Sequence, residues 1–149
     1  MLPEAISSVL RRKGDRKVLS ISPDSSVYEA IAVMAENSIG ALLVVSDSKL
    51  VGILSERDYA RKVVLQSRSS KDTQVSDIMS SPVITVSPGH TVEECMRLMT
   101  DKRIRHLPVI DGAAIIGIVS IGDLVRSVIT VQGEMIQQLQ QYINGPYPG

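Results

Sequence analysis

The sequence lacks the large aromatic side chains around which many cores are built. Its 149 residues include no Phe and no Trp, and the four Tyr are the only aromatic residues of the FWY class. A core must therefore be assembled from Ile, Val, Leu, Met and Ala. Hydrophobic residues make up 44% of the chain, which is ordinary for a globular domain of this length. This composition favours short aliphatic strands that alternate with helices.

Further absences exclude several classes of protein. A single cysteine, Cys95, excludes an internal disulfide and a cysteine-based zinc site. Sixteen Lys and Arg balance sixteen Asp and Glu, so no overall field attracts nucleic acid or anionic lipid. No apolar run approaches the roughly 20 residues of a membrane span, and the first residues lack the basic-then-apolar order of a secretory signal. We therefore expect a cytoplasmic protein that contacts neither nucleic acid nor membrane.

Patterns for the common catalytic and metal chemistries are also missing. His90 and His106 have no Cys or carboxylate at ligand spacing, which makes a poor metal site. No Gly-x-Ser-x-Gly, Walker A or Gly-x-Gly-x-x-Gly pattern is present. Ser55 and Ser120 each have an Asp nearby but no His at an activating distance in the sequence. Cys95 lies on the apolar face of an expected helix, which predicts a buried and inert thiol.

The sequence contains an internal repeat: two copies of one segment align without a gap at an offset of 65 residues. Ser22-Pro23 aligns with Ser87-Pro88 in this shift. Other identical pairs are Val18 and Val83, Met34 and Met99, Gly52 and Gly117, Ser55 and Ser120, and Asp58 and Asp123. An internal repeat of this kind indicates two copies of one structural unit that bury their apolar faces together.

Each copy predicts the order strand, helix, strand, strand, helix, which is an α/β (α+β) fold class. The evidence is an apolar run, a Ser-Pro turn with helix-capping residues, apolar residues at helical spacing, and a hairpin of two apolar runs. In the first copy the elements are expected at Val18–Ile21, Val27–Met34, Ala41–Val45, Leu50–Leu54 and Glu56–Gln66. In the second they are expected at Val83–Val86, Val92–Met99, Leu107–Ile110, Ala114–Val119 and Ile121–Thr130.

The predicted organisation has five segments. They are an N-terminal helix or arm (1–16), the first repeat (17–66), a linker (67–74), the second repeat (75–130), and a C-terminal helix and tail (131–149). In the tail an apolar stripe runs along the expected helix from Gln132 to Ile143. The favoured interpretation is that this stripe packs on its own domain; the alternative is that it docks a second subunit. We expect Asn144–Gly149 to be frayed.

The most informative segments are Gly52–Asp58 (GILSERD) and Gly117–Asp123 (GIVSIGD). In both, a buried strand runs into a helix, with Ser at the junction and Asp three residues later. One interpretation is a capping box, with Asp in place of the usual Glu. The other is a ligand site, because a helix N-terminus binds phosphate, Ser adds a hydroxyl, and a carboxylate accepts hydrogen bonds from both ribose hydroxyls. The spacing alone leaves both open, and two junctions indicate two equivalent sites.

At this point the chain resembles a tandem pair of cystathionine-β-synthase (CBS) domains, a Bateman module. The resemblance rests on the doubled Gly-hydrophobic-hydrophobic-Ser-x-x-Asp motif, with Asp77-Ile78-Met79 and Arg103–Asp111 in support, and it covers residues 17–130. Ser55–Lys62 and Arg105–Ile110 are most similar to small stand-alone CBS-pair proteins. The resemblance implies two βαββα repeats packed sheet against sheet about a pseudo-two-fold axis, with two clefts between them.

The resemblance also implies a ligand and its contacts. The ligand is an adenine nucleotide (AMP, ADP, ATP or NAD) or S-adenosylmethionine, and no metal is needed for the fold. Asp58 and Asp123 would bind the riboses, while Ser55 and Ser120 would face phosphate. Ile53 and Ile118 would line the clefts from below. Adenine would lie against the opposite repeat: Met79, Val83, Ile104, Arg105 and His106 for the Asp58 cleft, and Val18, Ile39, Gly40 and Ala41 for the Asp123 cleft.

The two copies differ where phosphate charge would be met. Arg57 aligns with Gly122, Gly40 with Arg105, and Ala41 with His106. Arg57 and Arg105 would supply two cations at the Asp58 cleft, unless Arg57 is simply a solvated surface residue. The Asp123 cleft would rely on helix N–H groups and Ser120, with His106 reaching in from its own repeat. We therefore expect two sites of unequal affinity.

The leading functional hypothesis is a regulatory adenine-nucleotide sensor that alters how the protein meets a partner. The alternative is an interaction and dimerisation scaffold with vestigial clefts. An enzyme acting on nucleotides is the least expected class, since no general base or metal site accompanies the motif. The resemblance further implies a homodimer formed through helices. The sequence does not identify the nucleotide or the regulated partner.

Overall fold

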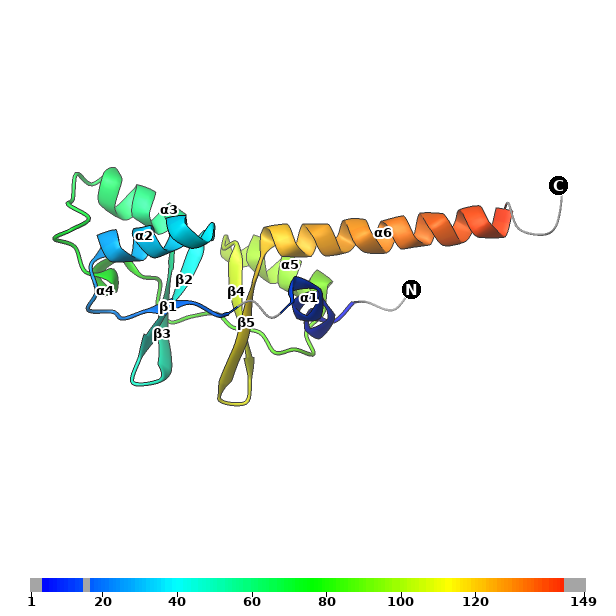
Figure 1. The fold of residues 1–149 in the computed structure, drawn as a ribbon, viewed down its shortest axis with the longest axis horizontal. Helices are drawn as coiled ribbons and strands as arrows, with labels where there is room; N and C mark the ends of the chain where they lie inside the picture. The colour runs from blue at the N-terminus through cyan, green and yellow to red at the C-terminus, as the bar shows by residue number, and fades with distance from the viewer. Residues whose placement is uncertain (1–3, 15–16, 144–149) are drawn as a thin grey trace. The chain divides into compact units, whose positions relative to one another are not determined.

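Two compact units make up the chain. The structure is a computed structural model that describes residues 4–14 and 17–143 (Figure 1). The first unit comprises Lys17–Ile84, and the second unit combines Met1–Arg16 with Thr85–Gly149. This division differs from the predicted segments in two places. The N-terminal arm belongs with the second repeat, and the segment from 75 to 84 belongs with the first.

The sheet of the first unit has three strands. β1 (Ser20–Ile21) is parallel to β2 (Ala41–Ser46), and β2 is antiparallel to β3 (Lys49–Ser55), in the order β1-β2-β3. The hairpin between β2 and β3 is confirmed, with Ala41 opposite Ser55 at its open end. β1 is shorter than predicted, because only Ser20 and Ile21 pair with β2.

Four helical segments accompany this sheet. Helix α2 (Val27–Asn37) begins at Ser26, whose side chain accepts the N–H of Glu29, and its face of Val27, Ala30 and Met34 is buried in the core with β2. After β3 the chain forms α3 (Glu56–Tyr59), the π-helical turn η1 (Ala60–Val64) and, farther on, α4 (Val75–Ile78). The single α-helix predicted over Glu56–Gln66 is therefore wrong in detail, since only its first turn is α-helical.

The second unit is built on a two-stranded antiparallel sheet of β4 (His106–Asp111) and β5 (Ala114–Ser120). The strand predicted at Val83–Val86 is not formed. Only Val86 forms a bridge, parallel to Val109, donating its N–H to Pro108 (3.0 Å). The reason is that the chain passes from one unit to the other between Ile84 and Thr85, so the predicted strand is divided between them.

Three helices complete the second unit. They are α1 (Ile6–Lys13), α5 (Val92–Lys102) and α6 (Ile121–Ile143). The short helix expected near the N-terminus is thus confirmed. Cys95 is fully buried on α5, as predicted, and burial raises the pKa of its thiol to about 11. No helix among residues 4–14 and 17–143 is long and apolar enough to cross a membrane.

Helix α1 occupies in the second unit the place that α4 occupies in the first. The N–H of Ile6 donates to the carbonyl of His90 (2.8 Å), and the N–H of Val75 donates to that of Ser25 (2.9 Å). His90 and Ser25 are equivalent in the 65-residue repeat, whereas Ile6 and Val75 are 69 residues apart. Each unit is thus completed by a short helix. In the first unit this helix, α4, follows the repeat in the sequence, whereas in the second unit it is α1, from the N-terminal end of the chain.

This equivalence explains the glycine of each motif. A Cβ on Gly52 would collide with the side chain of Met79, the residue that follows α4. A Cβ on Gly117 would lie 2.7 Å from Cδ2 of Leu10 on α1. Leu10 and Met79 are each the fifth residue counted from the start of their helix, so at both glycines a side chain of the equivalent helix lies close to the sheet.

Helix α6 is continuous from the motif to the end of the described chain. The helices predicted at Ile121–Thr130 and Gln132–Ile143 are one element of 23 residues. Figure 1 shows α1 and α5 beside its first half only. From Gln132 to Ile143 every residue is exposed, so the prediction that the tail packs on its own domain is wrong. The frayed end expected at Asn144–Gly149 lies outside the described residues.

Candidate functional site

The first motif forms a capping box where β3 runs into α3. The backbone N–H and the hydroxyl of Ser55 both donate to Oδ2 of Asp58, at 2.9 and 3.0 Å, and the N–H of Asp58 donates to Oγ of Ser55 (3.1 Å). The other carboxylate oxygen, Oδ1, lies 3.2 Å from Nζ of Lys62. The capping interpretation of the motif is therefore confirmed here, since Ser and Asp reciprocally satisfy the start of the helix.

The second motif has the same backbone geometry and more charge around it. The N–H of Ser120 donates to Oδ2 of Asp123 (2.8 Å), and the N–H of Asp123 donates to Oγ of Ser120 (3.2 Å). Lys13 donates to the same Oδ2 (2.9 Å) and to the carbonyl of Ile118 (2.8 Å). Arg126 donates to Oδ1 (2.7 Å). Asp123 thus lies between two cations, while Asp58 faces one.

Lys13 and Lys62 are the cations that the sequence analysis did not single out. Each pairs with the motif Asp of its unit and donates to a backbone carbonyl, Ile118 for Lys13 and Ile78 for Lys62. They come from different elements, α1 and η1. No alignment of the two repeats pairs them, so the 65-residue pattern carried no signal for their shared role.

A depression of about 490 Å³ lies beside Asp123 within the second unit. It is lined by Val9, Arg12, Lys13, Asp123, Arg126, Ser127 and Thr130. Arg12 forms an ion pair with Glu4 and donates to Oγ of Ser127 (3.1 Å). Three cations and one carboxylate therefore line this depression, with Glu4 paired to Arg12 as a second carboxylate nearby, which leaves an excess of positive charge.

These charges set the protonation of the site. Burial alone would raise the pKa of Asp123, but the hydrogen bonds from Lys13, Ser120 and Arg126 outweigh it and hold that pKa below its usual range. Burial lowers the pKa of His106, and the charges of Lys13 and Arg105 add to this, although Asp123 opposes them. At neutral pH the site therefore holds an ionised Asp123 and a neutral His106.

The first residues of each hairpin lie beside the motif of their own unit. Ala41 is opposite Ser55 in the β2–β3 ladder, and the carbonyl of Gly40 accepts the N–H of Glu56 (3.0 Å). In the second unit His106 is opposite Ser120, and the carbonyl of Arg105 accepts the N–H of Ile121 (2.9 Å). His106 thus reaches the Asp123 surroundings from its own repeat, as the sequence analysis allowed.

The remaining predicted site residues are divided between the units. The first unit holds Val18, Ile39, Ile53, Arg57, Met79 and Val83, and the second holds Ile104 and Ile118. Met79 and Val83 were expected to face Asp58 from the opposite repeat; the structure instead places them in the same compact unit as Asp58. The reason is that the chain changes units after Ile84, later than the repeat pattern indicated. Arg57 is half-buried and Arg105 is exposed.

The described residues do not gather metal ligands in either unit. In the part of the chain that the structure describes, no group of three His, Cys, Asp or Glu side chains is arranged to hold an ion. At the two junctions Ser, Asp and the neighbouring cations form hydrogen bonds and ion pairs.

Comparison with known proteins adds the family context. A model of the CBS domain matches residues 7–65 and 75–130. The chain is 47% identical over 150 residues to the CBS domain-containing protein CBSX3 of Arabidopsis thaliana, which is named as mitochondrial; the match covers 95% of this chain and 73% of that protein.

Two solved structures are also similar. A protein with CBS domains from Burkholderia ambifaria MC40-6 has a TM-score of 0.82 and 52% identity, covering 85% of this chain and 94% of that one. The CBS domain pair of protein MJ0100, solved in complex with 5-methylthioadenosine and S-adenosyl-L-methionine, has a TM-score of 0.75 and 25% identity, covering 85% of this chain and 97% of that one.

Proposed function

The chain belongs to the family of CBS-domain proteins, and we propose that it is a non-catalytic regulatory module that binds an adenine nucleotide and alters the binding of a partner. Two CBS domains account for most of its length. The Arabidopsis relative is named for its CBS domains and for no enzymatic activity, which supports a regulatory role. That relative is mitochondrial by name, so a cytoplasmic location for this chain stays a prediction.

The observation that carries the proposal is the motif carboxylate, which is fixed at a helix start and has acceptor capacity to spare. An ionised carboxylate accepts about four hydrogen bonds. Asp58 uses Oδ2 for Ser55, while Oδ1 has only the Lys62 ammonium at 3.2 Å. One position is therefore open, and a second becomes available when the rotatable hydroxyl of Ser55 turns away from Oδ2, so two ribose hydroxyls can be accepted. The adenosine moiety of both molecules bound to the MJ0100 pair supports this choice.

The second site is proposed to differ in its preference for charge. At Asp123, Oδ2 accepts Ser120 and Lys13, and Oδ1 accepts Arg126. A ribose must displace at least one of these cations, and a ligand phosphate then accepts the hydrogen bonds that the cation gives up. We therefore assign Lys13 and Arg126 to the phosphates of a nucleotide at this site, with Arg12 near them.

The two sites are still proposed to differ in affinity, but the more positively charged site is now the one at Asp123 and not the one at Asp58. From the sequence, the Asp58 cleft was expected to have the greater positive charge, through Arg57 and Arg105. The cations in contact with a motif carboxylate are Lys62 alone for Asp58, but Lys13 and Arg126 for Asp123. We propose that Asp123 favours ligands with phosphate, while Asp58 also accepts uncharged adenosine derivatives. The clefts between repeats and a homodimer are part of the same proposal, on the family resemblance.

Calorimetry on the full chain tests the proposal. The titrants are adenosine, AMP, ADP, ATP, NAD and S-adenosylmethionine, and the variant is Asp58→Ala combined with Asp123→Ala. At least one titrant should give binding heat with the wild-type chain and none with the variant. Because both Asp residues also cap helices, the variant loses stability of order 1 kcal/mol per cap.

A matched control separates capping from binding. Asp77 forms a capping box at α4 with the backbone of Gln74, outside either motif. The Asp77→Ala variant therefore loses a cap of the same kind in a more exposed position, and should bind nucleotide like the wild type. Heat that persists in the double variant would overturn the ribose assignment, and absence of heat with every titrant on the wild type would overturn the sensor function in favour of a scaffold.

A further inference from the structure

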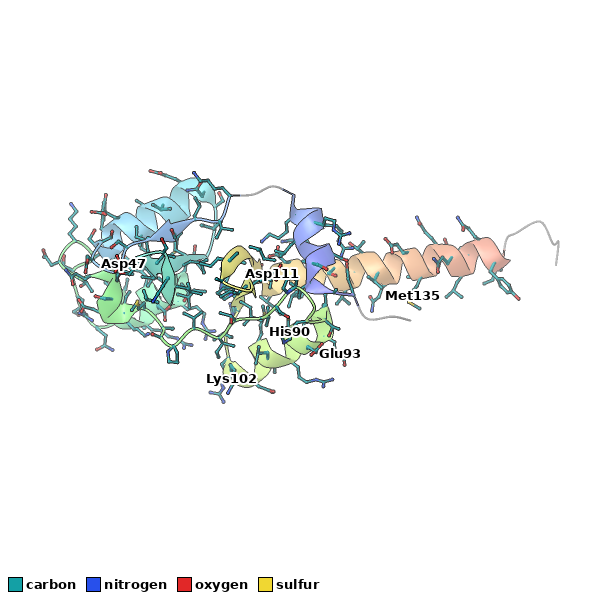
Figure 2. All side chains as sticks on the ribbon, turned by 90° about the horizontal axis from the view of Figure 1, so that it is seen from below. Asp47, His90, Glu93, Lys102, Asp111 and Met135 are labelled. Atoms are coloured by element: carbon teal, nitrogen blue, oxygen red, sulfur yellow. The ribbon has the colours of Figure 1, made fainter. Side chains whose placement is uncertain are left out.

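The second half of α6 carries an apolar face that its own unit does not cover. Ile129 is 62% exposed, Leu139 58% and Ile143 70%. Figure 2 shows Met135 on the part of α6 that extends past α1 and α5, with side chains standing out on all sides of the ribbon. A solvated helix of about a dozen residues is only marginally stable by itself. The exposed apolar face along this helix therefore marks an interaction surface.

The exposed apolar residues follow a heptad. Ile129, Ile136 and Ile143 are seven residues apart and fall at a positions, while Val125, Gln132 and Leu139 fall at d positions. Val128, Met135 and Tyr142 widen the same face at g positions. Ile at the a positions with Leu139 at d is the pairing typical of two parallel strands, while Val125 and Gln132 occupy the other d positions. A heptad needs a partner helix with the same spacing, and a second copy of α6 supplies one.

Charge argues for the same occupant. Between Ser127 and Ile143 the only charged residue is Glu134, at the outward f position of the heptad. Two copies therefore meet without repulsion, and a strongly charged partner finds nothing to pair with. The polar face consists of Gln with Thr130 and Glu134, and it lacks the Lys and Arg that hold an amphipathic helix on a membrane surface.

Gln132 fixes the register. A polar side chain at one core position of a coiled coil selects the alignment in which it meets its own copy, because any other alignment buries it against an apolar layer. In a parallel dimer with no stagger, Gln132 faces Gln132, and each amide both donates and accepts. We propose that residues 125–143 of α6 pair with those of a second copy as a parallel, in-register, two-stranded coiled coil.

The coiled coil goes beyond the regulatory function and does not depend on nucleotide binding. It spans 19 residues, about 28 Å at a rise of 1.5 Å per residue. It begins directly after Asp123 and Leu124, so the dimer seam continues the helix that carries the second motif. A ligand that moves the start of α6 thereby moves the seam as well.

Cysteine crosslinking on the full chain tests the pairing. Leu139→Cys places a thiol at a d position, where two copies meet, and Gln141→Cys places one at the outward f position of the same helix. Under mild oxidation the Leu139→Cys chain should form a disulfide-linked dimer in several-fold higher yield than the Gln141→Cys chain. Cys95 is fully buried and does not compete. Equal yields, or a dimer from neither variant, would overturn the proposal.

A charge pair on the two faces of the helix gives a second readout. Ile136→Glu with Leu139→Glu introduces two charges into the seam, and Gln137→Glu with Gln141→Glu introduces the same two charges on the opposite face. The first pair should lower the helical signal in far-UV circular dichroism and weaken self-association in sedimentation, while the second leaves both unchanged. The same response from both pairs would show that the apolar face has no partner copy.

Discussion

Removing the ammonium of Lys13 should destabilise the protein more than removing that of Lys62. In both cases Met is the replacement, because it keeps the aliphatic stem and deletes the charge. Lys13 donates to Asp123 and to the carbonyl of Ile118, and its side chain is 23% exposed. Lys62 makes the corresponding contacts with Asp58 and Ile78, but its side chain is 43% exposed.

The magnitudes follow from that difference in exposure. Hydrogen bonds to charged groups contribute about 1.5–3 kcal/mol each, and Asp123 keeps Ser120 and Arg126 after the change, so Lys13→Met should cost about 2 kcal/mol. Solvent screens the Lys62 pair, so Lys62→Met should cost less than about 1 kcal/mol. For a chain of this size 1 kcal/mol corresponds to roughly 2–4 °C in melting temperature. Lys13→Met should thus lower the Tm by about 4–8 °C.

Thermal and urea unfolding of the two variants, side by side at neutral pH, check this prediction. The Lys13 variant should also lose the contact that holds the end of α1 on the second unit, which protease cleavage near Gly14 reports. Equal shifts in the two variants, or a larger shift for Lys62→Met, would refute the view that Lys13 is a structural partner of the motif carboxylate.

Three further predictions rest on single residues. Gly133→Ala should raise the free energy of unfolding by about 0.5–1 kcal/mol, because the position lies inside α6 and a Cβ there meets nothing within 4 Å. An unchanged free energy in urea unfolding would contradict a stable helix at this point. Because the pKa of Asp123 is lowered in the folded state, its carboxylate stays ionised below the usual carboxyl pKa of about 3.9. The free energy of unfolding of the wild type should therefore fall as the pH drops through that region, whereas Asp123→Asn, which is less stable at pH 7, should show a flatter pH profile. The Cys95 thiol, with a pKa raised to about 11, should react with a thiol reagent only after unfolding, and rapid labelling of the native chain would disprove its burial.

Much of each unit follows from local pattern. The helices α2 and α5 and the two hairpins are set by apolar periodicity and by capping residues such as Ser26 and Thr91, all readable within a few residues. The motif Ser and Asp were also identified from spacing. Their capping geometry is local, so it formed as the pattern indicated.

Long-range pairing is what the sequence did not reveal. Helix α1 completes the second unit from the other end of the chain, and Lys13 reaches Asp123 across 110 positions. In the repeat alignment the residue equivalent to Lys62 is Ser127, so comparing the copies does not identify Lys13 as the cation that pairs with Asp123. The stripe on α6 was visible, but periodicity shows that a face is apolar without showing what covers it.

Native mass spectrometry of the full chain, titrated with ADP, shows whether the two Ser–Asp junctions bind nucleotide. We expect up to two ADP per chain, with the tighter site lost in Asp123→Ala, the weaker lost in Asp58→Ala, and both retained in Asp77→Ala. A chain that binds no ADP, or binds it unchanged in all three variants, would contradict the assignment of the two Ser–Asp junctions as nucleotide sites.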